Sequence, residues 1–144
     1  MKKIFIQSLN PFPQHLFFNI GVLFLRVAVC VEMIVVHGFK KLGIGVVEAE
    51  KVPNPLHLPE TFNYVFAVAA NIFFPCMVLI GLCTRLATLP TLAVTLTGYF
   101  ILHWNDALLV KDTPFIYSVI FLAILIIGPG KYSVDNYIYK KRPR

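Results

Sequence analysis

The chain has 144 residues, of which 58% are hydrophobic and only 14% are charged. Soluble domains carry about 25% charged residues, so this composition excludes an ordinary soluble protein and predicts an integral membrane protein. The net charge of +6 does not indicate a nucleic-acid partner, because no stretch alternates basic and aromatic residues. The length leaves room for one domain with about four membrane spans.

The first predicted span, residues 16–38, is long and apolar enough to cross a bilayer, for which about 20 apolar residues suffice. It nevertheless contains Arg26, Glu32 and His37. An ionisable side chain at the centre of a membrane costs about 2.5–3.5 kcal/mol on insertion scales, so such residues usually face a bundle interior or a wet cavity. The proline-interrupted stretch before this span lacks a small-residue cleavage site, so we expect an uncleaved insertion signal.

The second predicted span, residues 61–83, contains two residues that disturb a helix. Asn71 lies at its middle, and Pro75 follows one turn later. A proline inside a helix leaves a carbonyl without its N–H donor, so a neighbouring helix or polar group must supply one. The sequence therefore predicts a kink between Asn71 and Pro75.

The third predicted span, residues 86–104, follows a short turn at Arg85. Small residues on one helical stripe favour close packing against a neighbour, and this span has such a stripe in Thr91, Thr95 and Gly98. The fourth span is predicted over residues 114–128. Thr113 suits its N-cap and Pro114 its first helical position.

The distribution of basic residues predicts the orientation of the spans. The two chain ends and the turn between spans two and three carry eight of them, namely Lys2, Lys3, Arg85, Lys131, Lys140, Lys141, Arg142 and Arg144. The other two connections carry four, namely Lys40, Lys41, Lys51 and Lys111. Because cytoplasmic segments are enriched in Lys and Arg, both termini are predicted to be cytoplasmic.

This topology sorts the polar residues by depth. Arg26 and Asn71 each lie ten residues into their helix, near the membrane midplane. Glu32 lies about 9 Å further toward the outer face at the helical rise. It is also rotated about 120° from Arg26, whereas His37 shares the face of Arg26. Arg26 and Glu32 therefore either point at different neighbours, or Arg26 bends outward and the pair meets in a cavity.

The predicted result is a polar track between the helices. Arg26 and Asn71 form its floor and Glu32 its wall, and its outer mouth consists of His37, His103, Asp106 and Asp112. The alternative is a satisfied, buried Arg26 that only fixes helix register, with mouth residues that are merely exposed. Two histidines and a carboxylate could hold a divalent metal, but no local ligand motif supports this, and no metal site is predicted.

Several stretches resemble one family of membrane proteins. The first span with its ending, LFLRVAVCVEMIVVHGFKKL, resembles the first span of DoxX-type proteins. The turn VLIGLCTRLATLP, the outer connection HWNDALLVKDTPFIY and the ending ILIIGPGKYSVDNYI resemble later motifs of that family in the same order. The resemblance covers about residues 16–138. It implies an all-α, integral membrane four-helix bundle in the bacterial inner membrane.

The resemblance also shows where this chain departs from the family. Many members place a Glu in the second span where this chain has Asn71, and that Glu would pair with the arginine of the first span. We hypothesise that Glu32 supplies the charge instead. Asp112 occupies the position where a Glu commonly opens the last span.

Three functions stay open at this point. The first is an accessory subunit of a quinone-linked redox system, since the family takes its name from subunits of a thiosulfate:quinone oxidoreductase. Arg26 and Asn71 would then hold a quinone head group, and the outer His and Asp residues would relay protons. The second is binding or transport of a small molecule or lipid, for which a pore would require a homo-oligomer. The third is a scaffold for a partner membrane protein. No reaction is assigned, so whether the chain is an enzyme stays open.

Overall fold

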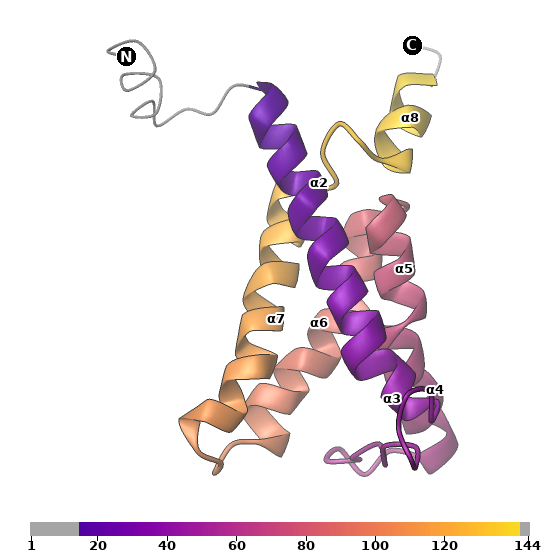
Figure 1. The fold of residues 1–144 in the computed structure, drawn as a ribbon, viewed down its shortest axis with the longest axis vertical. Coiled ribbons are helices and arrows are strands. Elements are labelled where there is room, and N and C mark those ends of the chain that lie inside the picture. The colour runs from indigo at the N-terminus through magenta and orange to yellow at the C-terminus, as the bar shows by residue number, and fades with distance from the viewer. Residues whose placement is uncertain (1–14, 142–144) are drawn as a thin grey trace.

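The protein is a bundle of long apolar helices, seen in a computed structural model that describes residues 15–141 (Figure 1). Within these residues, four helices are long and apolar enough to cross a membrane. They cover His15–Lys41, Glu60–Ile80, Thr84–Leu102 and Leu108–Ile127. The expected all-α, integral membrane four-helix bundle is thereby confirmed. The lead-in before the first span and the basic residues at both extreme ends lie outside the described residues.

The first spanning helix changes its winding near its outer end. The α-helix α2, His15–Glu32, continues into the π-helical segment η1, Met33–Gly38, and then into the short α-helix α3, Phe39–Lys41. A π-helical turn holds one more residue than an α-helical turn and is rare, and such turns are frequent at functional sites. His37 lies inside this segment.

The second spanning helix breaks where the sequence predicts a kink. The helix α4, Glu60–Asn71, ends one residue before α5, Phe73–Ile80, and Ile72 between them has φ −126° and ψ −65°. The carbonyl of Ala70 at this break accepts a hydrogen bond of 2.8 Å from the hydroxyl of Thr91. The Thr91 hydroxyl of α6 therefore supplies a donor to a carbonyl beside the break, whereas the carbonyl that Pro75 leaves without an N–H donor is that of Asn71, four residues before it.

The helices of the third and fourth spans pack closely on each other. The helix α6, Thr84–Thr97, ends in the π-helical segment η2, Gly98–Leu102, and is followed by α7, Leu108–Ile127. The Ser118 hydroxyl of α7 donates a hydrogen bond of 2.9 Å to the Thr95 hydroxyl of α6. The stripe of small residues on α6 thus takes part in the contact with α7, as the sequence predicts.

The start of α7 differs from the sequence expectation. The helix begins six residues before Pro114, with Ala107 as its N-cap, so Pro114 lies inside it and Thr113 is not a cap. The apolar run Leu108 to Val110 extends the helix outward to a length that can cross a bilayer. Pro114 is the seventh residue of this helix, beyond the first four N–H groups that lack intrahelical partners, so it removes one hydrogen bond, to the carbonyl of Val110.

The two ends of the bundle are built differently. Figure 1 shows the last helix, α8, Val134–Lys141, at the same end as the start of α2 and the turn between α5 and α6. We call this the inner end, following the expected orientation. The opposite, outer end carries the connection 42–59 and the turn 103–107. Apolar side chains fill the middle of the bundle, among them Val29, Met33, Val78, Phe121 and Ile124.

Candidate functional site

A cavity of about 610 Å³ lies at the outer end of the bundle. Its walls come from η1, α3, α4, the outer part of α6 with η2, α7 and the connection 42–59. Most lining side chains are apolar. The polar groups among them are His37, Lys40, Lys41, Glu50, Asn63, Asn71, Thr95, Thr97, His103, Thr113 and Tyr117.

The π-helical segment η1 places His37 on the cavity wall. Its imidazole packs edge-on against the ring of Tyr117, with ring centroids 5.1 Å apart and planes at 90°. The extra residue per turn rotates the residues after Met33 relative to a regular α-helix. His37 was expected at the outer mouth, and the structure places it beside Tyr117 of α7.

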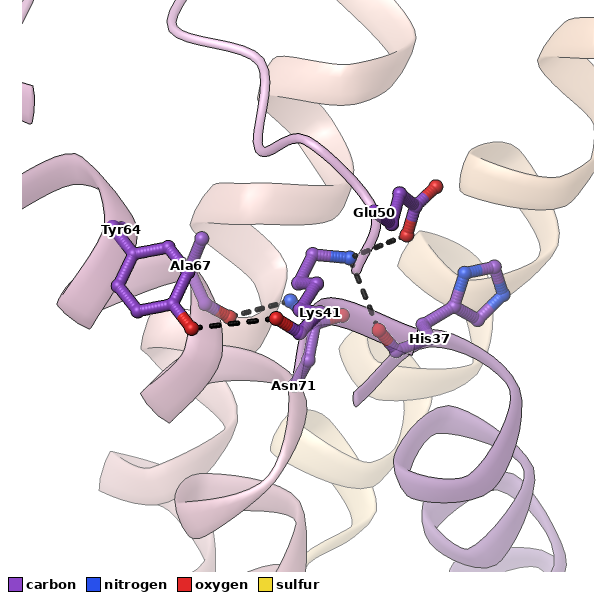
Figure 2. A network of polar contacts seen from close by, with 6 residues as sticks. All are labelled: His37, Lys41, Glu50, Tyr64, Ala67 and Asn71. Atoms are coloured by element: carbon purple, nitrogen blue, oxygen red, sulfur yellow. Dashed lines mark hydrogen bonds and ion pairs between the residues drawn. The ribbon is translucent and has the colours of Figure 1, made fainter. Parts of the chain in front are cut away.

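Lys41 is the centre of a polar network above the cavity, drawn in Figure 2. Its ammonium donates to the carbonyl of His37 at 3.1 Å and contacts the Glu50 carboxylate at 3.4 Å. The Tyr64 hydroxyl donates to the Lys41 carbonyl at 3.3 Å. The side chain of Lys41 is only 11% exposed. In the sequence, Lys41 is recognisable only as an orienting charge. The spacing of four residues between His37 and Lys41, one helical turn, is the signal that links them.

Asn71 contributes a buried amide at the break in the second spanning helix. It is 4% exposed, and its amide nitrogen donates a hydrogen bond of 2.6 Å to the Ala67 carbonyl. The close approach of Gly38 keeps the first helix against this break. A Cβ at Gly38 would stand 2.9 Å from the Asn71 carbonyl oxygen and 2.5 Å from Ile72 Cγ1.

A histidine–carboxylate pair lies at the outer turn. His103 Nδ1 is 2.7 Å from Asp106 Oδ2, and His103 also lines the cavity. If Nδ1 carries the proton, Nε2 is left as an acceptor, since a neutral imidazole has one donor and one acceptor nitrogen. Of the expected mouth residues, the structure therefore brings His37 and His103 to one cavity, with Asp106 behind His103.

Arg26 lies away from this cavity, at the inner end of the bundle. It is 1% exposed, and its guanidinium donates to three backbone carbonyls. Nε bonds the Leu79 carbonyl at 3.3 Å, Nη2 bonds that of Tyr132 at 2.7 Å, and Nη1 bonds that of Pro129. The expected floor of Arg26 and Asn71 is therefore not formed, because the guanidinium ties α2 to the loop after α7 and to the end of α5.

Asp135 is a structural residue at the inner end that the sequence analysis did not single out. Its carboxylate accepts hydrogen bonds from the Cys83 and Thr84 backbone N–H groups at 2.7 and 2.9 Å, and from the Thr84 hydroxyl at 2.8 Å. It thus satisfies donors at the start of α6 from a distant segment. Gly81 lies beside it, where a Cβ would be 2.5 Å from Ser133 Cβ.

Glu32 and Asp112 do not line the cavity. Both are exposed in the helical bundle. Arg26 and Glu32 form no ion pair in the part of the chain that the structure describes, so Glu32 does not take the partner role proposed for it. The guanidinium of Arg26 is instead satisfied by carbonyl oxygens.

The donor set at the outer cavity suits an organic head group. In the described part of the chain, no group of three His, Cys, Asp or Glu side chains is arranged to hold a metal ion. The cavity lining combines apolar side chains with side chains that carry nitrogen donors, namely Lys41, Asn71, His37 and His103. Such donors bind carbonyl or anionic oxygens.

The four apolar helices define a multi-pass helical membrane protein. The sequence model of the DoxX family matches residues 21–104, more than half of the chain, which therefore belongs to the DoxX family. The chain is also similar to an uncharacterised protein of Haemophilus influenzae (strain ATCC 51907 / DSM 11121 / KW20 / Rd). The two are 28% identical over 99 residues, which cover 65% of this chain and 66% of that relative. The match thus spans just under two thirds of the relative's length. No solved structure matches the chain.

Proposed function

We propose that this DoxX family protein binds a quinone or a similar lipophilic ring compound in the outer cavity, as an accessory subunit of a redox system in a bacterial inner membrane. The cavity of about 610 Å³ between the helices carries this proposal. Pockets for small ligands are typically about 300–1,000 Å³, with mostly apolar walls and a few polar groups that fix orientation. The outer cavity matches this description, and DoxX membership agrees with it.

Two sets of lining residues have different parts in the proposed binding: apolar side chains surround the ring, and polar side chains bind its oxygens. Aromatic and aliphatic side chains, among them Phe62, Phe66 and Val94, line the apolar walls and exclude water from a flat ring. Lys41, His37 and Asn71 lie on other parts of the wall and donate hydrogen bonds to ring oxygens. A bound quinone supplies reversible transfer of electrons and protons. His103, backed by Asp106 at 2.7 Å, is placed to accept a proton near the outer surface.

The proposed orientation puts both termini in the cytoplasm and opens the cavity on the outer face. The excess of basic residues at the inner end supports this orientation. Reporter fusions test it. Alkaline phosphatase fused after His57 should be active and after Lys141 inactive, and the reverse pattern would contradict the proposal.

Titration of a short-chain quinone into the purified protein in lipid nanodiscs tests the binding. We expect saturable binding, weakened about tenfold by Asn71→Leu, which removes a buried polar group from the wall. Asn105→Leu is the matched control, because Asn105 is exposed in the outer turn. Absence of saturable binding to the unsubstituted protein, alone and with a co-purified membrane partner, would contradict the proposal.

A small-molecule or lipid carrier is the second candidate, and the broken helix favours it. Asn71 beside the interruption, and residues of the π-helical segments η1 and η2, line the cavity, and π-helical segments are frequent at functional sites. Quinone binding without partner-dependent electron transfer, together with uptake of the compound into proteoliposomes, would favour this candidate over the redox subunit.

A further inference from the structure

Lys41 places a positive charge on the wall of the outer cavity. A neutral quinone has no negative charge to pair with it. We propose that the cavity selects ring compounds that carry an anionic oxygen, such as an ionised hydroxyquinone, and that this oxygen replaces Glu50 as the partner of the Lys41 ammonium. This inference rests on the proposed function, because it names the ligand class of the same cavity.

The first support is the unused capacity of Lys41. An ammonium group has three N–H donors. Among the described residues, two acceptors contact it, the His37 carbonyl at 3.1 Å and Glu50 Oε2 at 3.4 Å. Lys41 also lines the cavity, and one of its donors has no acceptor among the described residues.

The second support is the weakness of the Lys41–Glu50 contact. Charge-assisted hydrogen bonds between nitrogen and oxygen are usually about 2.7–2.9 Å long, and this contact measures 3.4 Å. The Glu50 side chain is 46% exposed, against 11% for Lys41. Solvation of the exposed Glu50 carboxylate weakens its attraction to the Lys41 ammonium. Glu50 can therefore return to water while Lys41 stays in place.

The third support is the charge balance of the cavity wall. The titratable side chains that line it are His37, Lys40, Lys41, Glu50, His103 and Tyr117. Two lysines thus face one carboxylate. Asp106, Asp112 and Glu32 are not part of the lining. An anion is therefore favoured over a neutral or cationic ligand of the same shape.

Two matched ligands test the inference. The probes are 2-hydroxy-1,4-naphthoquinone, which is ionised at neutral pH, and its neutral 2-methoxy analogue, each titrated into the full chain in nanodiscs. We expect the ionised compound to bind about tenfold more tightly, as a charge-assisted hydrogen bond implies. Equal affinities would overturn this inference and leave the proposed function standing. Failure of both compounds to bind would overturn both.

Variants separate ligand exchange from a structural role of the ion pair. Lys41→Gln should abolish the preference for the ionised compound, and Lys41→Arg should retain it. Glu50→Gln should strengthen binding of the ionised compound several-fold, because it removes the competing carboxylate. Lys51→Gln, at an exposed position outside the lining, is the control. A loss of affinity in Glu50→Gln that equals the loss in Lys41→Gln would overturn the inference, since it would show that the pair only holds the loop.

Discussion

Arg26 shows how a single buried charge is held in this bundle without a carboxylate. Its three bonded carbonyls belong to residues 53 to 106 positions away in the chain. Carbonyl oxygens carry partial negative charge, and those at the end of a helix have no intrahelical partner. The arginine thereby joins the first helix to the end of α5 and to the loop after α7. Its role in this structure is to fix the inner end of the bundle.

The loss of Arg26 should be more damaging than the loss of either of two other basic side chains. Arg26→Leu leaves three carbonyls without their donor, and we expect destabilisation of about 3 kcal/mol or more. Arg85→Leu removes one bond of 3.3 Å to Ile126 from an exposed side chain, and Lys41→Leu removes two contacts. Folded yield after size-exclusion chromatography in mild detergent measures the difference. Equal yields for the three variants would contradict this role for Arg26.

At the scale of elements, the crossing of the first helix over the break in the second positions the outer cavity. Gly38 permits this crossing because its missing Cβ leaves room for the Asn71 carbonyl and for Ile72. The break itself arises from Pro75, which has no N–H to donate to the turn before it. The cavity wall that includes Asn71 thus depends on one glycine and one proline.

Two glycines of the first spanning helix should respond oppositely to alanine. Gly38→Ala forces a Cβ to within 2.9 Å of a backbone oxygen, and we expect destabilisation of about 1–3 kcal/mol. Gly21→Ala meets nothing within 4 Å, so it should stabilise the helix by about 0.5–1 kcal/mol. Thermal unfolding in detergent, followed by loss of monodisperse protein, measures both. A stability in Gly38→Ala equal to that in Gly21→Ala would show that the helices can separate at this crossing.

Hydropathy and proline placement predict the spans because these signals are local. Four apolar stretches, the kink near Asn71 and the packing stripe at Thr95 could all be recognised from neighbouring residues. The partners of the polar side chains could not, since Arg26 is satisfied by backbone carbonyls, which carry no residue-type signal. Asp135 reaches the start of α6 from 51 positions away. From the sequence alone Lys41 is only an orienting charge, because its contact with Glu50 depends on the fold of the connection 42–59.

At the scale of the whole molecule, the polar contacts of Arg26 and Asp135 and the proposed ligand site lie at opposite ends of the bundle. The inner end is closed by Arg26, Asp135 and the loop after α7. The outer end contains the cavity, the π-helical segments and the Lys41 network. A ligand in the outer cavity would leave the contacts of Arg26 and Asp135 at the inner end intact. The quinone site is proposed for the outer end, where the cavity lies.

Photolabelling tests the central claim most directly. A quinone carrying a photoreactive azide is irradiated with the full chain in nanodiscs, with and without excess unlabelled quinone, and the labelled peptides are identified by mass spectrometry. Labels that compete with unlabelled quinone should lie in η1, in the connection 42–59 and around Tyr117 of α7. Competed labels confined to the lipid-facing side of α2 or to the inner end near Arg26 would contradict a quinone site in the outer cavity.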